Sequence, residues 1–315
     1  MNRKERLLNA IDFKPVDRPP HAELIFDLAE EAFGLRYPSE QEMAAASPAE
    51  LEKMLHTCCE IYARTVEEFG WDFVLDWKPA ARNDIQYRFI RLLKEYLPAD
   101  VPVGSYVWDS VICIDTIKAY MQFSVDAVDD PQKLLDWAED MKRRALIHVD
   151  KLTEAGCDII CVASDMAFNA GPFLSPRMFD RFTRPFLAEI VARVNENGPI
   201  SILHSDGMLM PIFDRLLDMK PRVIQSIDPM AGMDIAAVRK QTYGRVALMG
   251  NVRCSYLQDG PAELIVSSAK NAIDACTNGY DGGYIFSTSN SIFAGLPLEN
   301  YRVMLDYFHR RFPQT

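Results

Sequence analysis

The segment ISILHSDG, residues 200–207, places an imidazole and a carboxylate two residues apart at the end of an apolar run. Alternate residues of an extended chain share one face, so His204 and Asp206 are expected to point to the same side. Such a pair suits two uses: it can bind zinc, or it can act as a general acid with its orienting carboxylate. The alternative is a histidine that only hydrogen-bonds a neighbour. We favour a chemical role because the other four of the five histidines fall on predicted helices or near the termini.

Other apolar runs also end in polar residues. If the runs are parallel strands, their carboxyl ends meet at one mouth, where several acids would raise each other's pKa unless a cation offsets them. The pattern therefore predicts a metal site. We assign catalysis to His204, Asp206 and Asp165, and metal binding to His204, Asp206 and Glu23. The expected substrate-binding residues are Glu23, Trp108, Asp109, Asn251, Ser289 and Asn290.

The elements that must position these residues are eight short apolar runs separated by longer amphipathic stretches. Nearly continuous apolar runs are typical of strands covered on both faces, and their alternation with helices indicates a parallel sheet. The runs are residues 19–28, 71–77, 101–109, 157–164, 199–205, 222–228, 245–251 and 282–289.

Several helix starts are marked by residues that cap a first turn. Ser47 with Pro48, Asp130 with Pro131, and Ser175 with Pro176 are such signals. Eight strands interleaved with helices predict an α/β protein, a (β/α)8 TIM barrel, as a single domain over residues 1–315. An open doubly wound sheet would alternate similarly, but no glycine-rich dinucleotide fingerprint follows the first run.

Composition excludes several classes of partner. The formal net charge of −11 disfavours nucleic acid and anionic membranes, which are bound through clustered Lys and Arg. No apolar run reaches the roughly 20 residues that span a bilayer, and MNRKERLLNAID has no signal-peptide core, so we expect a cytoplasmic protein. Seven scattered cysteines form no disulfide framework, and Cys157 and Cys161 read as buried strand residues.

The chain resembles the uroporphyrinogen decarboxylase superfamily over nearly its whole length. The resemblance rests on the order of five segments: RKERLLNAIDFKPVDRPP (3–20), DMAFNAGPFLSPRMFDRFTRPF (165–186), HSDG (204–207), LMGNVRCSYLQDGPAELI (248–265) and GGYIFSTSNSIFAGLPLENY (282–301). It implies a (β/α)8 barrel, in agreement with the count of apolar runs. The superfamily includes the haem-pathway decarboxylase and a set of corrinoid-dependent methyltransferases.

Two departures help to choose between these branches. The decarboxylase carries Arg-x-Ala-Gly-Arg after its first strand, where this chain reads LIFDLAEEAFGLRYP, with acids instead. An entrance of this kind would hold a polyanionic porphyrinogen poorly. Thiol-methylating members carry zinc on His-x-Cys and a later Cys, whereas this chain has Asp206 and then Ser289 or Asn290. A histidine and carboxylate site is a harder Lewis acid, which suits a leaving oxygen.

The resemblance therefore implies an O-demethylating methyltransferase. It would move a methyl group from a small methylated substrate, such as a methoxylated aromatic, to the cobalt of a corrinoid protein. His204 and Asp206 would bind zinc or protonate the leaving oxygen, Glu23 or Asp165 would complete the shell, and Trp108 would line the pocket. No cobalamin-binding segment is recognisable, so the cobalamin would arrive on a partner protein. A uroporphyrinogen decarboxylase and a non-catalytic small-molecule-binding barrel stay open as alternatives, as do the methyl donor, the leaving atom and a homodimer.

Overall fold

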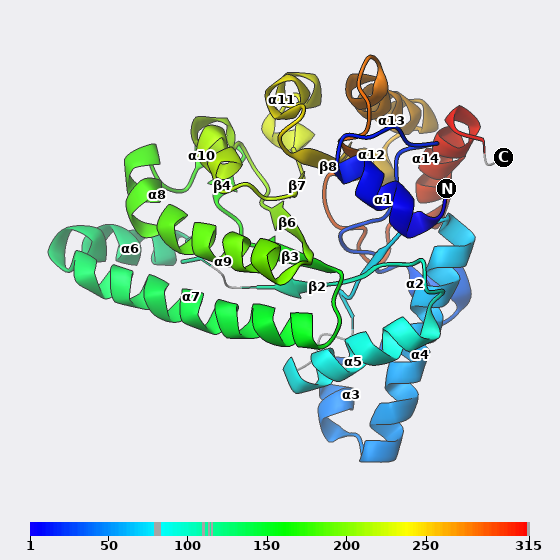
Figure 1. Cartoon of the computed structure of the whole chain (residues 1–315), viewed down its shortest axis with the longest axis horizontal. Helices are drawn as coiled ribbons and strands as arrows, with labels where there is room; N and C mark the ends of the chain where they lie inside the picture. Colours follow the sequence, from blue (N-terminus) through cyan, green and yellow to red (C-terminus); the bar gives the residue numbers. More distant parts are fainter. Residues whose placement is uncertain (79–82, 109–110, 113, 115, 314–315) are drawn as a thin grey trace.

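The strands form one curved parallel sheet with helices packed around it (Figure 1). The computed structural model of the chain describes residues 1–78, 83–108, 111–112, 114 and 116–313. Within them, seven strands pair in the order β1-β2-β3-β6-β7-β8-β9. These strands are β1 Val74–Leu75, β2 Val103–Val107, β3 Ile159–Ala163, β6 Ile200–His204, β7 Val223–Gln225, β8 Ala247–Val252 and β9 Tyr284–Thr288. Each lies in or overlaps a run that the sequence marks as a strand.

Residues 19–28 fill the eighth position of the barrel. Phe286 N of β9 donates a hydrogen bond to Pro20 O over 2.8 Å on one side, and Asp72 N donates to His21 O over 2.7 Å on the other. Regular ladder pairing is reduced here to isolated bridges, because the two prolines that start this segment have no N–H to donate. The predicted (β/α)8 barrel is confirmed, with an irregular first strand.

Helices connect the strands and cover the outside of the sheet. The three predicted helix starts are confirmed: Ser47 caps α4, where it forms a capping box with Glu50, Asp130 caps α7, and Ser175 caps α8. The α-helices are α1 Arg3–Ile11, α2 Ala29–Phe33, α3 Glu40–Ala45, α4 Pro48–Phe69, α5 Asn83–Tyr96, α6 Ile117–Asp129, α7 Pro131–Glu154, α8 Pro176–Phe182, α9 Arg184–Asn197, α10 Phe213–Asp218, α11 Ile235–Thr242, α12 Cys254–Asp259, α13 Ala262–Thr277 and α14 Leu298–Arg311. Two 3₁₀ turns, η1 Met210–Ile212 and η2 Pro229–Ala231, follow β6 and β7.

The core lies in the barrel and between the sheet and its helices. All five residues of β2, β3, β6 and β9 are buried, as expected for strands covered on both faces. The ring of Phe286 in β9 stacks on Phe308 of α14 at 4.4 Å between centroids. The six cysteines that the structure describes are buried and free, and no described helix is long and apolar enough to cross a bilayer.

A small antiparallel hairpin, which the sequence did not indicate, sits at the carboxyl end of the sheet. It pairs β4 Ala167–Phe168 with β5 Gly171–Pro172 directly after β3. Phe168 O accepts from Met208 N over 3.0 Å, so the hairpin rests on the chain that follows β6. The hairpin therefore holds the loop after β3 against the loop after β6.

Candidate functional site

His204 is the last residue of β6, and its imidazole is held in one orientation. The ring Nδ1 lies within hydrogen-bond distance of Gln225 Oε1 at the end of the neighbouring strand β7. The Gln225 amide nitrogen faces Ser289 O at 3.5 Å, which identifies the other amide atom as the oxygen. An amide oxygen only accepts, so Nδ1 carries the proton and Nε2 is free to act as acceptor or ligand. Nε2 lies 3.9 Å from Asp165 Oδ1.

Asp206 is fixed by two hydrogen bonds from other strand ends. Its Oδ1 accepts from Ser226 Oγ over 2.7 Å, and its Oδ2 accepts from Asn290 Nδ2. Burial raises the pKa of this carboxyl; the neighbouring His204 imidazole opposes the shift, and the charge of Asp165 adds to it. Part of this shift therefore comes from neighbouring carboxylates, the effect expected for acids that share a mouth.

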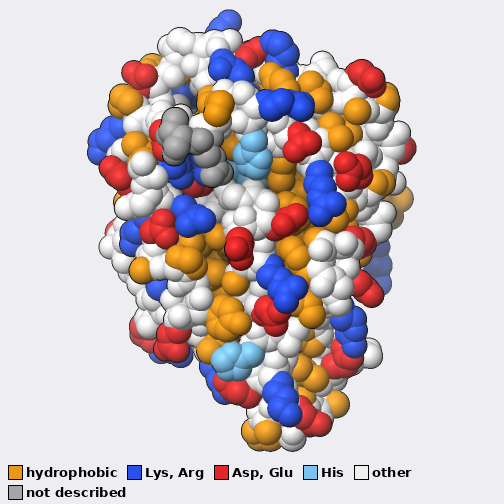
Figure 2. Space-filling view, turned by 90° about the vertical axis from the view of Figure 1, so that its right-hand side faces the viewer, with side chains coloured by type: hydrophobic (Ala, Val, Ile, Leu, Met, Phe, Trp, Pro, Cys, Tyr) orange, Lys and Arg blue, Asp and Glu red, His pale blue; other side chains and the backbone are white. Residues whose placement is uncertain are grey.

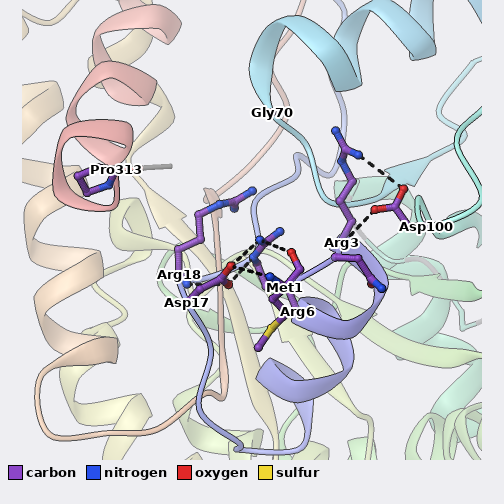
Figure 3. A pocket seen from close by; sticks show the side chains of 9 residues that line it. Met1, Arg3, Arg6, Asp17, Arg18, Gly70, Asp100 and Pro313 are labelled. Carbon is purple, nitrogen blue, oxygen red and sulfur yellow. Dashed lines mark hydrogen bonds and ion pairs between the residues drawn. The ribbon is translucent and has the colours of Figure 1, made fainter. Parts of the chain in front are cut away.

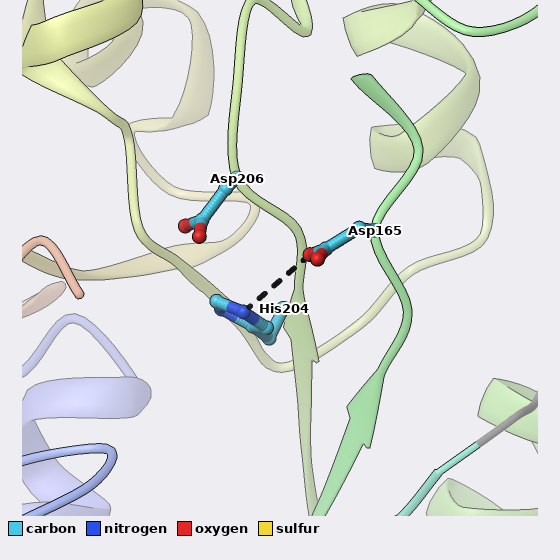
Figure 4. Close-up of side chains that lie close together, drawn as sticks. All are labelled: Asp165, His204 and Asp206. Carbon is cyan, nitrogen blue, oxygen red and sulfur yellow. Dashed lines mark ion pairs between the residues drawn. The ribbon is translucent and has the colours of Figure 1, made fainter. Parts of the chain in front are cut away.

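Asp165, His204 and Asp206 form one cluster (Figure 4). One ligand atom from each residue, a ring nitrogen or a carboxylate oxygen, lies within 4.8 Å of the others. Zinc accepts this combination of imidazole and carboxylates, and bond lengths of about 2 Å need only small side-chain movements from these positions. The Nδ1–H bond to Gln225 is the support that a metal-binding imidazole needs. The residues present therefore fit a divalent ion.

Gly207 allows the two halves of this cluster to approach. Its φ is +84°, and a Cβ on it would lie 2.6 Å from Ala167 O. The same contact is supported by Ser205 Oγ, which accepts from Met166 N over 3.0 Å. Only glycine fits this position without moving the loop that carries Asp165.

Glu23, which we expected among the metal ligands, lies outside this cluster. Its buried carboxylate turns toward β9, where Oε2 accepts from Ser287 Oγ and Thr288 N over 2.8 Å each and is 2.6 Å from Thr288 Oγ1. Its Oε1 has no hydrogen-bond partner among the described residues. Burial raises the pKa of Glu23 to about 7, although the Thr288 and Ser287 hydrogen bonds oppose this. Glu23 is therefore a buried carboxyl that keeps its proton to a higher pH than an exposed glutamate does.

Replacement of Glu23 by glutamine is expected to remove a pH-dependent loss of stability. The unfolded carboxyl titrates near 4.5 and the folded one near 7, so the native state binds the extra proton. The stability of the wild type therefore falls as pH rises from about 4.5 to 7, by roughly 3 kcal/mol from this group, and stays lowered above. Between pH 5 and pH 8, urea unfolding should show Glu23→Gln gaining about 2.5 kcal/mol of stability relative to the wild type.

The matched control for this prediction is Glu67→Gln on the exposed face of α4, which should change stability equally at both pH values. The prediction is wrong if the difference in stability between Glu23→Gln and the wild type changes by less than about 0.5 kcal/mol from pH 5 to pH 8. Glu23 would then be ionised in the folded protein at neutral pH.

Trp108 belongs to an aromatic wall at the end of β2. It stacks on Tyr106 at 4.6 Å between centroids and meets Trp77 edge-on at 6.2 Å. The indole is 45% exposed, so a flat ligand can reach it. Because β2 neighbours β3, Trp108 and Asp165 follow adjacent strand ends. Asp109, the next predicted residue, lies outside the described residues.

The remaining predicted ligand-binding residues have mainly supporting contacts. Asn251 is buried, and its amide donates to Ile227 O over 2.8 Å. Ser289 is buried beside Cys254, with its Oγ 3.8 Å from the sulfur. Asn290, which binds Asp206, also donates its backbone N–H to Cys254 Sγ over 3.2 Å. Of these three residues, Asn290 contacts the cluster directly.

Sequence reasoning missed Ser226 and Cys254. Ser226 reaches Asp206 from a backbone with φ of +95°, and nothing in the pattern of β7 signals that turn. Cys254 stands where α12 begins, and burial raises the pKa of its thiol to about 11. It is therefore a neutral thiol that buttresses Asn290.

A hollow of about 330 Å³ lies near the chain termini (Figure 3). It is rich in arginines, but their charges are already matched. Arg6 Nε donates to Asp17 over 2.7 Å, Arg3 pairs with Asp100, and Arg18 pairs with Asp72. With its cations neutralised, this hollow is a weaker candidate for ligand binding than the cluster at the strand ends.

Residues 74–311 match the family described as Uroporphyrinogen decarboxylase (URO-D). A protein named uroporphyrinogen decarboxylase from Anaeromyxobacter dehalogenans (strain 2CP-C) is 27% identical over 238 residues, which cover 73% of this chain and 65% of the relative. One of the same name from Legionella pneumophila (strain Paris) is 34% identical over 255 residues, 75% of this chain and 67% of the relative. The chain thus spans about two thirds of the length of these relatives.

Among solved structures, a methyltransferase from Methanosarcina mazei superposes with a TM-score of 0.74. The match covers 99% of both chains at 20% sequence identity. Similarity at this level of identity establishes the shared fold alone.

Proposed function

The chain belongs to the uroporphyrinogen decarboxylase family, and from this premise we propose that it is a methyltransferase that demethylates a small methoxylated substrate and passes the methyl group to the cobalt of a corrinoid protein. The observation that carries the proposal is the cluster of Asp165, His204 and Asp206 beside an aromatic wall. This donor set lacks a thiolate and suits a hard divalent ion and an oxygen leaving group.

Asp165, His204 and Asp206 would hold the ion. Bound there, zinc would polarise the ether oxygen as a Lewis acid. The chain's own residues prepare the site: Gln225 keeps the His204 Nε2 lone pair directed toward Asp165, and Ser226 and Asn290 hold both oxygens of Asp206. Preorganised side chains of this kind lower the barrier because they need not rearrange during the reaction.

The substrate ring would lie against the exposed face of Trp108, whose other face stacks on the buried Tyr106. The corrinoid of the partner protein would accept the methyl carbon as the bond between this carbon and the ether oxygen breaks. The oxygen would keep the bonding pair and take up a proton, so that the demethylated alcohol or phenol is the second product. Asn251, Ser289 and Asn290, together with Glu23, would bind or support the polar part of the substrate.

Exposed apolar side chains at the rim of the barrel mouth support the proposal that the methyl acceptor is carried by a protein. Large apolar side chains project there from the loops after four different strands, and each is between 44% and 48% exposed: Trp108, Phe168, Met230 and Phe293. Apolar patches around a site are typical of protein-binding surfaces. We infer that a corrinoid-carrying partner docks on this rim.

The second candidate is uroporphyrinogen decarboxylase itself, which the names of the two curated relatives favour. The charge of the site weighs against it, because Asp165 and Asp228 both add to the negative field at Asp206. Arg36, in the segment after the first strand, pairs with Glu42. A substrate with many carboxylates would therefore meet repulsion at the cluster. Release of carbon dioxide from uroporphyrinogen measures this alternative directly.

Protein purified without chelator is expected to contain about one equivalent of zinc, and to transfer methyl groups from a panel of methoxylated aromatics to a reduced corrinoid protein. Elemental analysis gives the first result, and the absorbance change of the corrinoid gives the second. Less than about a tenth of an equivalent, with activity intact in chelator, contradicts the metal site. Tight ligand binding without methyl transfer across the panel would instead indicate a binding protein.

A further inference from the structure

Two adjacent residues directly after β7 have a backbone conformation that side chains rarely adopt. Of the described residues other than glycine, four have a positive φ, and among these Ser226 (+95°) and Ile227 (+49°) are neighbours. Both residues are buried. A β-branched residue such as isoleucine is a clear outlier in this region, because its Cβ crowds the backbone. Such strained positions persist only where the surrounding structure holds them, and they cluster at functional sites.

The turn at Ser226 and Ile227 lets two consecutive side chains face the same cluster. In an extended strand, neighbouring residues point to opposite faces of the sheet. Here Gln225 Oε1 accepts from His204 Nδ1, and the next residue, Ser226, donates from Oγ to Asp206 Oδ1 over 2.7 Å. The positive φ of Ser226 changes the direction of the chain directly after Gln225. The end of β7 therefore supports two of the three clustered side chains.

The end of β8 holds this turn in place. The side-chain amide of Asn251 donates to Ile227 O over 2.8 Å. Gly250 lets the two backbones approach, since a Cβ on it would stand 2.7 Å from Ser226 O. Asn251 is 5% exposed, so its amide serves where water cannot easily reach the Ile227 carbonyl. A side chain that cannot donate would leave this carbonyl unsatisfied and the strained turn free to relax.

We propose that Asn251 is a positioning residue: it holds the strained turn at Ser226 and Ile227, and through that turn it aims the Ser226 hydroxyl at Asp206. The inference rests on the proposed metal-binding role of Asp206, and it gives Asn251 a task other than the substrate contact expected from the sequence. Without the Ser226 hydrogen bond, the Asp206 carboxylate would turn more readily and the ligand atoms would be less well preorganised. Supports of this kind typically contribute about 10- to 100-fold to metal affinity.

Zinc affinity, measured by competition with a chromophoric chelator, reports on this cluster. Among the described residues, Asp165, His204 and Asp206 form the one group of three side chains with metal-ligand spacing. On the face with the chain termini, shown in Figure 2, acidic side chains are interspersed with Lys and Arg. Asn251→Ala and Ser226→Ala should each bind zinc about tenfold more weakly than the wild type. The double variant should also bind about tenfold more weakly, because both changes remove the same hydrogen bond to Asp206.

Asn195→Ala is the matched control. The Asn195 amide also donates to the carbonyl of a residue with positive φ, Lys220 O over 3.0 Å. This contact lies before the start of β7, whereas the cluster lies at the ends of the strands. The control should therefore bind zinc like the wild type. If Asn251→Ala does not yield folded protein, Asn251→Ser takes its place, because the shorter side chain also leaves Ile227 O without its amide donor.

Two measurements on metal-free protein test the turn itself. Hydrogen exchange over residues 223–232 should be faster in Asn251→Ala than in the wild type or in Asn195→Ala. Ser226→Gly should unfold at a higher urea concentration than Ser226→Ala, because glycine adopts a φ of +95° without strain. Both Ser226 variants lose the hydroxyl, so both should bind zinc equally weakly.

The proposal is overturned if Asn251→Ala weakens zinc binding as much in the Ser226→Ala background as in the wild type, because the two residues would then act separately. Unchanged exchange over residues 223–232 overturns it as well. If the wild type binds no zinc, the metal site of the proposed function is wrong, and the exchange and urea measurements alone decide whether Asn251 holds the turn.

Discussion

His204→Ala is expected to abolish zinc binding and to lower the rate of methyl transfer at least about a thousandfold. The substitution removes the one nitrogen ligand of the described cluster, and Gln225 presents only its amide oxygen to this space. It also leaves the carboxylates of Asp165 and Asp206 facing each other without the opposing imidazole. Metal content and single-turnover methyl transfer to the corrinoid measure the two effects on the same preparation.

Two further variants separate a role at the reacting atoms from a general loss of structure. His56→Ala removes an exposed imidazole of α4 that contacts Glu52 and the ring of Tyr96, and it should leave both readouts unchanged. Gln225→Leu keeps His204 but removes its Nδ1–H partner, and should cost about 10- to 100-fold in metal affinity or rate. Activity of His204→Ala within tenfold of the wild type would exclude the cluster as the reaction centre.

The barrel follows from the sequence because strands covered on both faces need continuous apolar runs. The runs at 199–205 and 282–289 contain β6 and β9 in full. The run at 19–28 is equally apolar, yet it forms only isolated bridges, since Pro19 and Pro20 cannot donate to a ladder. Hydrophobic pattern therefore locates the eighth position, while backbone chemistry decides how regular it is.

The position of a site residue was predictable where two residues share one strand end. It was less predictable where contacts between loops set the position of the side chain. His204 and Asp206 point to one space, as the spacing of two implies. Asp165 joins them because the loop after β3 packs on Gly207, a contact between segments about 40 residues apart. Glu23 sits on the irregular first strand and turns to Thr288 instead. The periodicity of apolar residues and the amino-acid composition carry no information on such contacts between loops.

Asp72→Ala is expected to destabilise the protein by about 3 to 5 kcal/mol, because it removes the counter-charge of Arg18 and one of the two carboxylates that pair with the buried Arg6. The Asp72 carboxylate is fully buried and accepts from Arg6 Nη1, from Arg18 Nη1 over 2.7 Å and from His21 N over 2.7 Å. Since Asp72 N also donates to His21 O, this one residue joins the first strand to β1 where the barrel closes. Urea unfolding of the variant and the wild type at the same pH gives the difference.

Loss of Asp72 should weaken the junction between residues 19–28 and β1, whereas loss of an exposed ion pair should not. Asp12→Ala removes an exposed carboxylate that pairs with Arg222, and should cost less than about 1 kcal/mol. Hydrogen exchange should accelerate in Asp72→Ala at Phe286 N, whose acceptor is Pro20 O, and less at the β3–β6 ladder on the far side of the sheet. Equal acceleration at both would mean that Asp72 supports the fold as a whole. Glu23 lies two residues beyond His21, so the contacts between Asp72 and His21 also help to fix the buried Glu23 carboxyl.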